Sequence, residues 1–249
     1  MDIMFSSPPT MFGFYHIAFL IGIVAVTTLL FFLLRRKDEK TLIRFIWIHG
    51  VIMILLEVWK QWFSAKYVYP GIFSMWYFPW QLCDIAMYCS FILPFVKGKV
   101  QDAILVFLSS FSLLAAIMAL IVPGDMLRPQ ILLFMHGFIY HGMMIAESLA
   151  AILILRKRGS VRFYPAVIIF LITAVIAEII NIISYHLIDN LQHVSNMFNI
   201  TPYYPSTQPV FHEIAVTVGI IPEILLYLLL IAAVSFGIFR LERIGCSKR

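Results

Sequence analysis

Seven long apolar segments follow one another along the chain, separated by short polar stretches. They lie near residues 14–34, 45–65, 79–97, 102–122, 130–155, 163–187 and 213–239. Each segment approaches or exceeds the roughly 20 apolar residues that an α-helix needs to cross the hydrocarbon core of a bilayer. The pattern predicts an all-α, polytopic integral membrane protein, in which residues 1–249 form one domain of seven transmembrane helices.

The basic residues are concentrated in every second connection between these segments. The connections at 35–44 and 156–162 carry five and four Lys or Arg residues, whereas the connection at 65–78 has one and the long connection at 188–212 has none. Basic connections remain in the cytoplasm during membrane insertion. We therefore predict that the N-terminus and the polar 188–212 loop are external and that the C-terminus is cytoplasmic.

Composition supports a multi-pass protein of the cell membrane. The chain is 62% hydrophobic and 12% charged, whereas a soluble domain is about half apolar and about a quarter charged. The net charge of +5 does not indicate a nucleic-acid partner, because the basic residues lie at the ends of apolar segments. The three cysteines form no Cys-x-x-Cys pattern, so neither a metal nor an organic cofactor is indicated.

Ionisable and strongly polar residues occur within the spans, where burial is costly and function is the usual reason for it. Those that share a level in the outer half of the bilayer are Glu57, Lys60, Gln81, Asp84, His136, His141 and Glu178. Their common depth predicts a polar cavity inside the bundle. A simpler interpretation applies to one pair, since Glu57 and Lys60 could merely hold helices together.

Other polar and aromatic residues of the spans receive structural or topological interpretations. Glu223 of the last span also belongs to the set at the shared level, and it follows Pro222, where a kink would free a backbone carbonyl. Glu147 lies near a predicted helix end and is interpreted as structural. Trp59 and Trp80 belong to an aromatic cluster that predicts an interfacial belt.

Cys83 differs from an ordinary buried cysteine in its surroundings. It lies in the run "YFPWQLCDIAMYC", in the first turns of a predicted helix, where the helix dipole favours a thiolate. An imidazole that takes the thiol proton would leave a nucleophile for acyl transfer. Gln81 or free N–H groups of the first turn could stabilise an oxyanion. Lys60 could stabilise charge, and Asp84 or Glu57 could orient the ring.

The runs "FPWQLCDI" and "FIYHGMMI" resemble the YwaF-type bacterial membrane proteins and, more distantly, the transmembrane protein 164 acyltransferase family. The resemblance implies that Cys83 accepts a fatty acyl group, that His141 is the base, and that the acyl group passes to a lysophospholipid. The implied partners are membrane phospholipids or lysophospholipids. His136 is the alternative base. One run departs from the bacterial pattern, because "GIIPE" replaces a Gly-Pro-Trp-Pro-like sequence.

Three functions therefore follow from the sequence. The first is an acyltransferase or lipid hydrolase that uses Cys83 and His141. The second is a small-solute or ion transporter built on Glu57, Lys60 and Glu178. The third is a non-catalytic membrane scaffold. Loss of the Cys83 thiol separates them, since only the first function requires it.

Overall fold

The computed structural model describes residues 4–244 except 73, 189 and 191–192, and this part of the chain is helical without strands. Six helices are long and apolar enough to cross a membrane. They are α1 (Phe14–Leu34), α2 (Glu39–Phe63, continued by a π-helical turn at Ser64–Val68), α4–α5 (Gly98–Phe107 and Leu113–Ile121, joined by a π-helical turn at Leu108–Ser112), α6 (Ile131–Lys157), α7 (Tyr164–Leu187) and α9 (Ile220–Glu242). The prediction of an all-α multi-pass membrane protein is confirmed.

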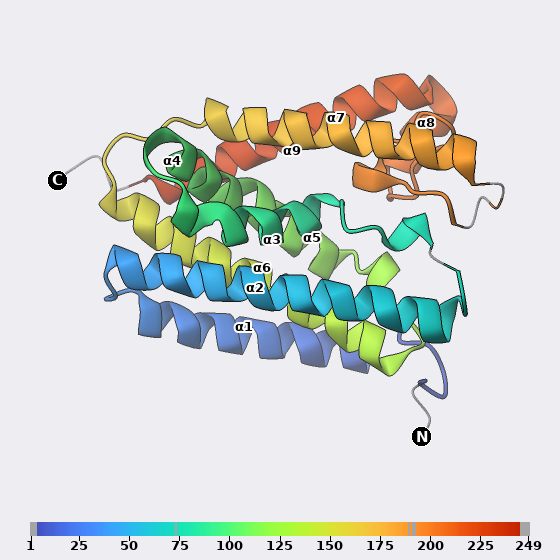
Figure 1. Cartoon of the computed structure of the whole chain (residues 1–249), viewed down its shortest axis with the longest axis horizontal. Coiled ribbons are helices and arrows are strands. Elements are labelled where there is room, and N and C mark those ends of the chain that lie inside the picture. The colour runs from blue at the N-terminus through green and yellow to red at the C-terminus, as the bar shows by residue number, and fades with distance from the viewer. Residues whose placement is uncertain (1–3, 73, 189, 191–192, 245–249) are drawn as a thin grey trace.

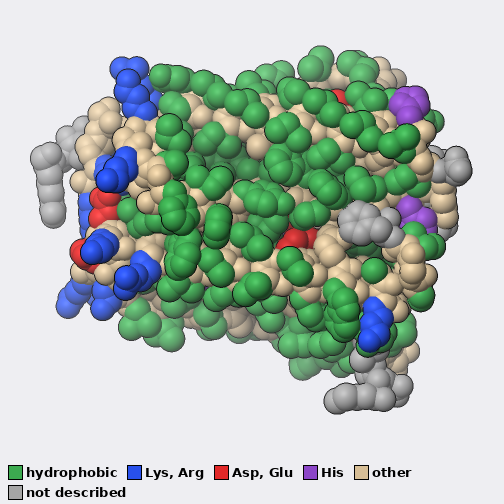
Figure 2. Space-filling view, in the orientation of Figure 1, with side chains coloured by type: hydrophobic (Ala, Val, Ile, Leu, Met, Phe, Trp, Pro, Cys, Tyr) green, Lys and Arg blue, Asp and Glu red, His purple; other side chains and the backbone are tan. Residues whose placement is uncertain are grey.

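The long helices lie side by side along the longest axis of the molecule (Figure 1). The α1–α2 and α6–α7 connections and the C-terminus lie at one end, and the N-terminus lies at the other. Lys and Arg side chains gather at the end that holds the C-terminus (Figure 2). We call this the basic end and the other the opposite end. The alternation of charge along the sequence thus becomes a separation of charge in space.

The third predicted span is much shorter than the sequence indicated. Helix α3 (Leu82–Ile92) and the 3₁₀ turn that follows it form an apolar helix over Leu82–Phe95, about 21 Å long at the standard rise. The chain before it runs back into the bundle, where the Trp80 indole donates a hydrogen bond to the Thr173 carbonyl of α7 at 3.1 Å. Thr173 lies about 14 Å from the start of α7. Trp80 is thus partly buried against α7, and α3 begins with a buried residue next to it. The place of Trp80 in an interfacial belt stays a prediction.

The last predicted span, 213–239, is divided in the structure. Helix α8 (Phe211–Val218) ends at Gly219, whose φ of 115° suits glycine, and α9 begins at the next residue. Pro222 has no N–H group to bond the carbonyl four residues before it. The sequence predicted a kink at Pro222 within this span, and the structure places the break three residues earlier, at Gly219.

The connection between α7 and α8 is not a simple surface loop. Within its described part, residues 193–201, which we call the inserted segment, are buried except for one partly exposed residue. Asn181 of α7 accepts the Met197 N–H at 2.6 Å and donates to the Met197 carbonyl at 3.1 Å. Ser184 accepts the Ser195 N–H at 2.8 Å. Because α7 side chains replace water as partners, the polar segment folds into the bundle instead of remaining in solvent.

Helices α2, α3 and α6 make the closest contacts in the bundle. A Cβ atom added to Gly50 of α2 would lie 2.8 Å from both the Phe91 nitrogen and the Ser90 Cβ of α3. Glu147 of α6 is fully buried, and the Ser90 hydroxyl donates to its Oε2 atom at 2.7 Å. Glu147 was expected near a helix end, but it lies within α6, where its carboxyl is buried and bonded to Ser90.

Candidate functional site

Cys83 is the second residue of α3 and is partly exposed as a residue. The helix is capped by Asp84, whose Oδ2 atom accepts the Gln81 N–H at 2.8 Å. The Asp84 and Ile85 N–H groups bond the Gln81 carbonyl. In the described part of the chain, the N–H groups of Leu82 and Cys83 have no carbonyl or other oxygen as a partner. Two N–H donors without an oxygen partner therefore lie at the positive end of the helix, and one of them, the Cys83 N–H, interacts with the Cys83 sulfur.

An ion pair on α2 lies close to this helix start. The Lys60 ammonium is 2.7 Å from Glu57 Oε1, and Gln61 donates to the same oxygen at 2.9 Å. Lys60 is also within electrostatic range of Asp84 and Cys83. Because the pair lies within a single helix, the ion pair itself does not link two helices. The pair lies near the start of α3, so Lys60 is a cation close to Cys83. We call Cys83 and the polar side chains around it the thiol region.

His141 of α6 has the tautomer that a base requires. Its Nδ1 atom lies 2.7 Å from the Gly137 carbonyl, which can only accept, so the ring proton is on Nδ1 and the lone pair is on Nε2. The ring is within electrostatic range of Lys60. No hydrogen bond joins it to the Cys83 sulfur among the described residues. Catalytic contacts of this kind often shorten only when substrate binds.

His136, the alternative base, is held between two aromatic rings. It stacks on Trp59 with a centroid distance of 5.8 Å and on Tyr140 with one of 5.6 Å. Its Nε2 atom is buried without a hydrogen-bond partner in the described chain. Lys60 is in electrostatic range of this ring too. Trp59, which is itself partly exposed, thus packs against His136, and its place in an interfacial belt stays a prediction.

Two predicted site residues are engaged elsewhere. The Gln81 amide donates to the Asn196 carbonyl at 3.0 Å and accepts the Phe198 N–H at 2.8 Å. Its donor is therefore committed to the inserted segment and is not free for an oxyanion. Glu178 of α7 is only partly buried and bonds the Asn181 side chain. A common depth brought Glu178 into the prediction, but its side chain belongs to the α7 contacts with the inserted segment.

Two tyrosines that the sequence analysis missed also lie near the thiol. Tyr140 of α6 donates to Asp84 Oδ1 at 3.5 Å and is within electrostatic range of Cys83. Tyr227 of α9 is within electrostatic range of Cys83 and hydrogen-bonds the Asn199 side chain. The available signal was the phenol itself, since a buried tyrosine hydroxyl usually requires a polar partner. The thiol region is thus built from α2, α3, α6 and α9.

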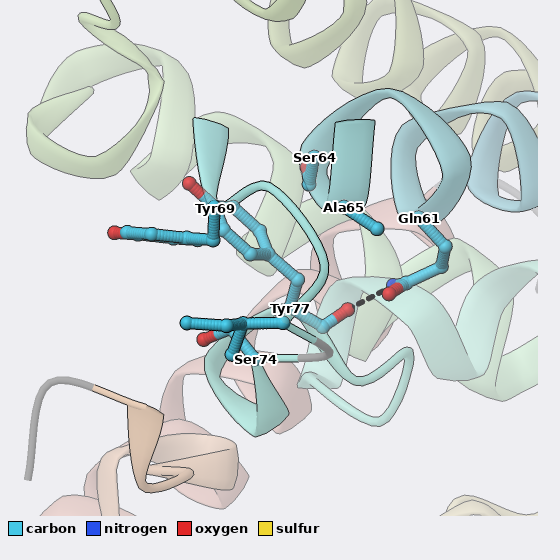
Figure 3. Close-up of a pocket in the computed structure, with 7 residues that line it drawn as sticks. Gln61, Ser64, Ala65, Tyr69, Ser74 and Tyr77 are labelled. Carbon is cyan, nitrogen blue, oxygen red and sulfur yellow. Dashed lines mark hydrogen bonds between the residues drawn. The ribbon is translucent and has the colours of Figure 1, made fainter. Parts of the chain in front are cut away.

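A small pocket lies one turn beyond the ion pair, toward the opposite end (Figure 3). Gln61 connects the two, because its amide donates both to Glu57 and to the Tyr77 carbonyl. The buried hydroxyls of Ser64, Ser74 and Tyr77 line the pocket and have no hydrogen-bond partner among the described residues. Polar groups therefore continue from the thiol region toward the end of the bundle.

The arrangement has the groups needed for nucleophilic acyl chemistry: a thiol at a helix start, an imidazole with a free Nε2 lone pair, a nearby ammonium and two free amides. Within the described residues, no group of three or more His, Cys, Asp or Glu side chains is placed to hold a metal ion.

Comparison with known proteins identifies the family. A sequence model described as the TMEM164 family matches residues 11–239. Searches of curated proteins and of solved structures found no match. The matched range runs from just before α1 almost to the end of α9 and includes every residue of the thiol region. Because the match covers nearly the whole chain, this protein belongs to the TMEM164 family.

Proposed function

We propose that the protein is a thiol-dependent acyltransferase of membrane lipids, with Cys83 as the nucleophile and His141 as the base. The observation that carries the proposal is the position of Cys83. It lies at the start of a helix that begins inside a membrane bundle, next to two free amides, with Lys60 and His141 in the same polar region. A merely structural cysteine needs none of these neighbours.

The first half-reaction forms a thioester. His141 Nε2 takes the proton of the Cys83 thiol, and the sulfur attacks the carbonyl carbon of a phospholipid ester. The tetrahedral oxyanion faces the free N–H groups of Leu82 and Cys83, which stabilise the charge as it develops. The carbon–sulfur bond is retained and the ester carbon–oxygen bond breaks. The lysophospholipid oxygen leaves with the proton from the imidazolium.

The second half-reaction regenerates the thiol. A lysophospholipid hydroxyl gives its proton to His141 and attacks the thioester carbonyl. A carbon–oxygen bond forms, the carbon–sulfur bond breaks, and the sulfur recovers the proton from the imidazolium. If water replaces the lipid hydroxyl, the same steps make the protein a lipid hydrolase. Lys60 stabilises negative charge on the sulfur, and Glu57 holds Lys60 in place.

We also infer that the chain is a YwaF-type member located in the cell membrane, with its basic end in the cytoplasm. The gathering of Lys and Arg at one end supports this orientation (Figure 2). The short helix α3 would then be a seventh, partly inserted helix. A transporter based on Glu57, Lys60 and Glu178 receives less support, because the Glu178 side chain bonds Asn181.

The test is direct detection of the acyl-enzyme. Purified protein is incubated with a phospholipid that carries a labelled acyl chain, and the label that hydroxylamine releases from the protein is measured. We expect the wild type to be labelled, Cys83→Ala to carry no label, and Cys89→Ala and Cys246→Ala to be labelled normally. His141→Ala should reduce the labelling rate strongly. Equal labelling of Cys83→Ala and wild type, or no labelling of the wild type, would refute the proposal.

A further inference from the structure

The inserted segment is held in the bundle by side chains from two helices. Gln81, at the start of α3, donates to the Asn196 carbonyl at 3.0 Å and accepts the Phe198 N–H at 2.8 Å. Asn181 of α7 bonds both backbone groups of Met197, accepting the N–H at 2.6 Å and donating to the carbonyl at 3.1 Å. Two amide side chains therefore bind the backbone of three consecutive residues, and one of these amides belongs to the helix that carries the candidate nucleophile.

The same segment contains polar atoms that lose their partners when it is inserted. His193 Nδ1, Asn196 Nδ2 and Thr201 Oγ1 are buried and make no hydrogen bond to the described residues. Burial of such an atom is unfavourable, because water would otherwise bond it. The segment follows α7 at the opposite end of the bundle (Figure 1), so water is available as soon as the segment leaves the interior. Withdrawal would therefore hydrate all three atoms.

Backbone strain also disfavours the inserted state. Phe198 has a φ of 59° and Asn199 a φ of 57°, and this left-handed conformation is least favourable for a bulky side chain such as phenylalanine. Strain of this kind persists only where the surroundings impose it, and it is concentrated at active sites, ligand clamps and switch regions. Burial of the apolar side chains of Val194, Met197, Phe198 and Ile200 acts in the opposite direction. The segment therefore has the opposing contributions expected of an element with two states.

We propose that the inserted segment is a lid over the start of α3, which closes by binding Gln81 and Asn181 and withdraws to admit a phospholipid ester to Cys83. This inference rests on the proposed acyl transfer. Residues 196–198 lie against Gln81, the residue directly before Leu82 and Cys83. A lipid ester that approaches this helix start from the side of the segment therefore meets the closed lid first. The closed lid also keeps water from the thioester, as closing loops do in many enzymes.

The first variant is Asn181→Leu, which keeps the approximate size of the side chain and removes both hydrogen bonds to the Met197 backbone. One hydrogen bond inside a membrane protein changes an equilibrium about threefold, so the open population should rise about tenfold. In the full-length purified protein, we expect single-turnover acyl labelling of Cys83 and protease cleavage within residues 193–201 to become faster by that factor, because both follow the open population. A merely structural role for Asn181 predicts slower labelling instead.

The second variant, Thr201→Val, should act in the opposite direction. Valine has the shape of threonine without the hydroxyl that the closed lid leaves unsatisfied, so the open population should fall about fivefold, and labelling and cleavage should slow together. Ser235→Ala is the matched control. The Ser235 hydroxyl is also buried without a partner among the described residues, but it lies on α9, outside the segment. Its removal should leave both rates within about twofold of wild type.

A third measurement tests the lid without acyl transfer. A water-soluble maleimide alkylates Cys83 in protein that carries Cys89→Ala and Cys246→Ala, and the lid predicts faster alkylation with Asn181→Leu and slower alkylation with Thr201→Val. If these changes occur but the wild type is never acylated, the proposed function fails and the lid stands. If Asn181→Leu is cleaved faster but alkylated no faster, the segment does not cover the thiol and the inference is overturned.

Two further outcomes are decisive. Equal alkylation of Thr201→Val and wild type would overturn the inference, because the unsatisfied hydroxyl would then have no effect on opening. If Asn181→Leu does not fold, Ser184→Ala replaces it, since the Ser184 hydroxyl accepts the Ser195 N–H at 2.8 Å. We expect that variant to be cleaved and alkylated about threefold faster than wild type, and alkylation at or below the wild-type rate would overturn the lid.

Discussion

Replacement of Gln81 by alanine separates a support role from a catalytic one. The Gln81 amide makes two hydrogen bonds to the inserted segment, at 3.0 Å to the Asn196 carbonyl and at 2.8 Å from the Phe198 N–H. Both partners are backbone groups of residues that are about 1% exposed. In Gln81→Ala, water does not easily replace the lost amide, so one buried donor and one buried acceptor remain without partners.

The size of the effect follows from these two groups. A buried polar group left unsatisfied costs about 1–3 kcal/mol. Hydrogen bonds inside membrane proteins contribute about 0.6 kcal/mol on average, which places the expected loss toward the lower part of the summed range. We therefore expect Gln81→Ala to lower the free energy of unfolding by about 2–4 kcal/mol. The inserted segment should also become more accessible to protease, because Gln81 connects it to α3.

The assay is reversible unfolding of the purified protein in mixed micelles, followed by limited proteolysis of the folded state. Gln130→Ala is the matched control, because Gln130 also precedes a long helix but its side chain makes no capping hydrogen bond. We expect that variant to unfold within about 0.5 kcal/mol of wild type. If Gln81→Ala has unchanged stability and proteolysis but abolishes acyl labelling, Gln81 is an oxyanion donor and the present reasoning is wrong.

Three further changes test the packing and the buried charges. Gly50→Val should lower the free energy of unfolding by about 1–3 kcal/mol or more, because the new atoms overlap the α3 backbone. Gly22→Val is the control and should be well tolerated, since nothing lies within 4 Å of an added Cβ. Thermal unfolding measures both variants, and equal melting temperatures would contradict the close approach of α2 and α3. Lys60→Met should lower the free energy of unfolding by about 3–5 kcal/mol, because it leaves the Glu57 charge without its cation. The double variant Lys60→Met with Glu57→Met should recover most of that loss, and a double variant as unstable as the single one would argue against the pair. Glu223→Gln should stay within about 0.5 kcal/mol of wild type in the same unfolding assay, because neither carboxyl oxygen has a partner to lose among the described residues; a loss as large as that of Lys60→Met would reveal a partner for Glu223.

The long helices were predictable because hydrophobic length is a direct signal of a span. The prediction of a third full span failed, because an apolar stretch of the same length can form either a full span or a shorter helix preceded by a turn. Residues 79–97 are as apolar as a full span, yet the helix starts only after Gln81, where Asp84 caps it. The spacing of Gln81 and Asp84 fits a capping box and was available in the sequence. The position of that helix start in the bundle could not be read from the sequence, because it depends on the hydrogen bond between Trp80 and a carbonyl of α7.

The candidate site was also only partly predictable from the sequence. Rise per residue gives depth along a helix, and Lys60 does lie within electrostatic range of both α6 histidines. Depth does not give direction around the helix axis, which is why Glu178 was grouped with residues that its side chain does not join. The inserted segment was equally beyond a composition argument. Its polar residues indicate a loop in water unless the α7 side chains that bind them are known.

The length of α3 is relevant to the proposed lipid chemistry, because it sets the depth of the helix start. The C-terminal end of α3 lies toward the basic end, where α4 begins (Figure 1). A helix of about 21 Å that starts from that face stops about 9 Å short of the other side of a 30 Å hydrocarbon core. Free amides at such a depth are normally excluded from lipid, and here the protein surrounds them. The ester groups of a phospholipid lie at the edge of the same core, so in the proposed reaction a modest displacement of one lipid would bring its carbonyl to Cys83. In that reaction a full-length α3 would place the thiol at the surface, where water would compete for the thioester.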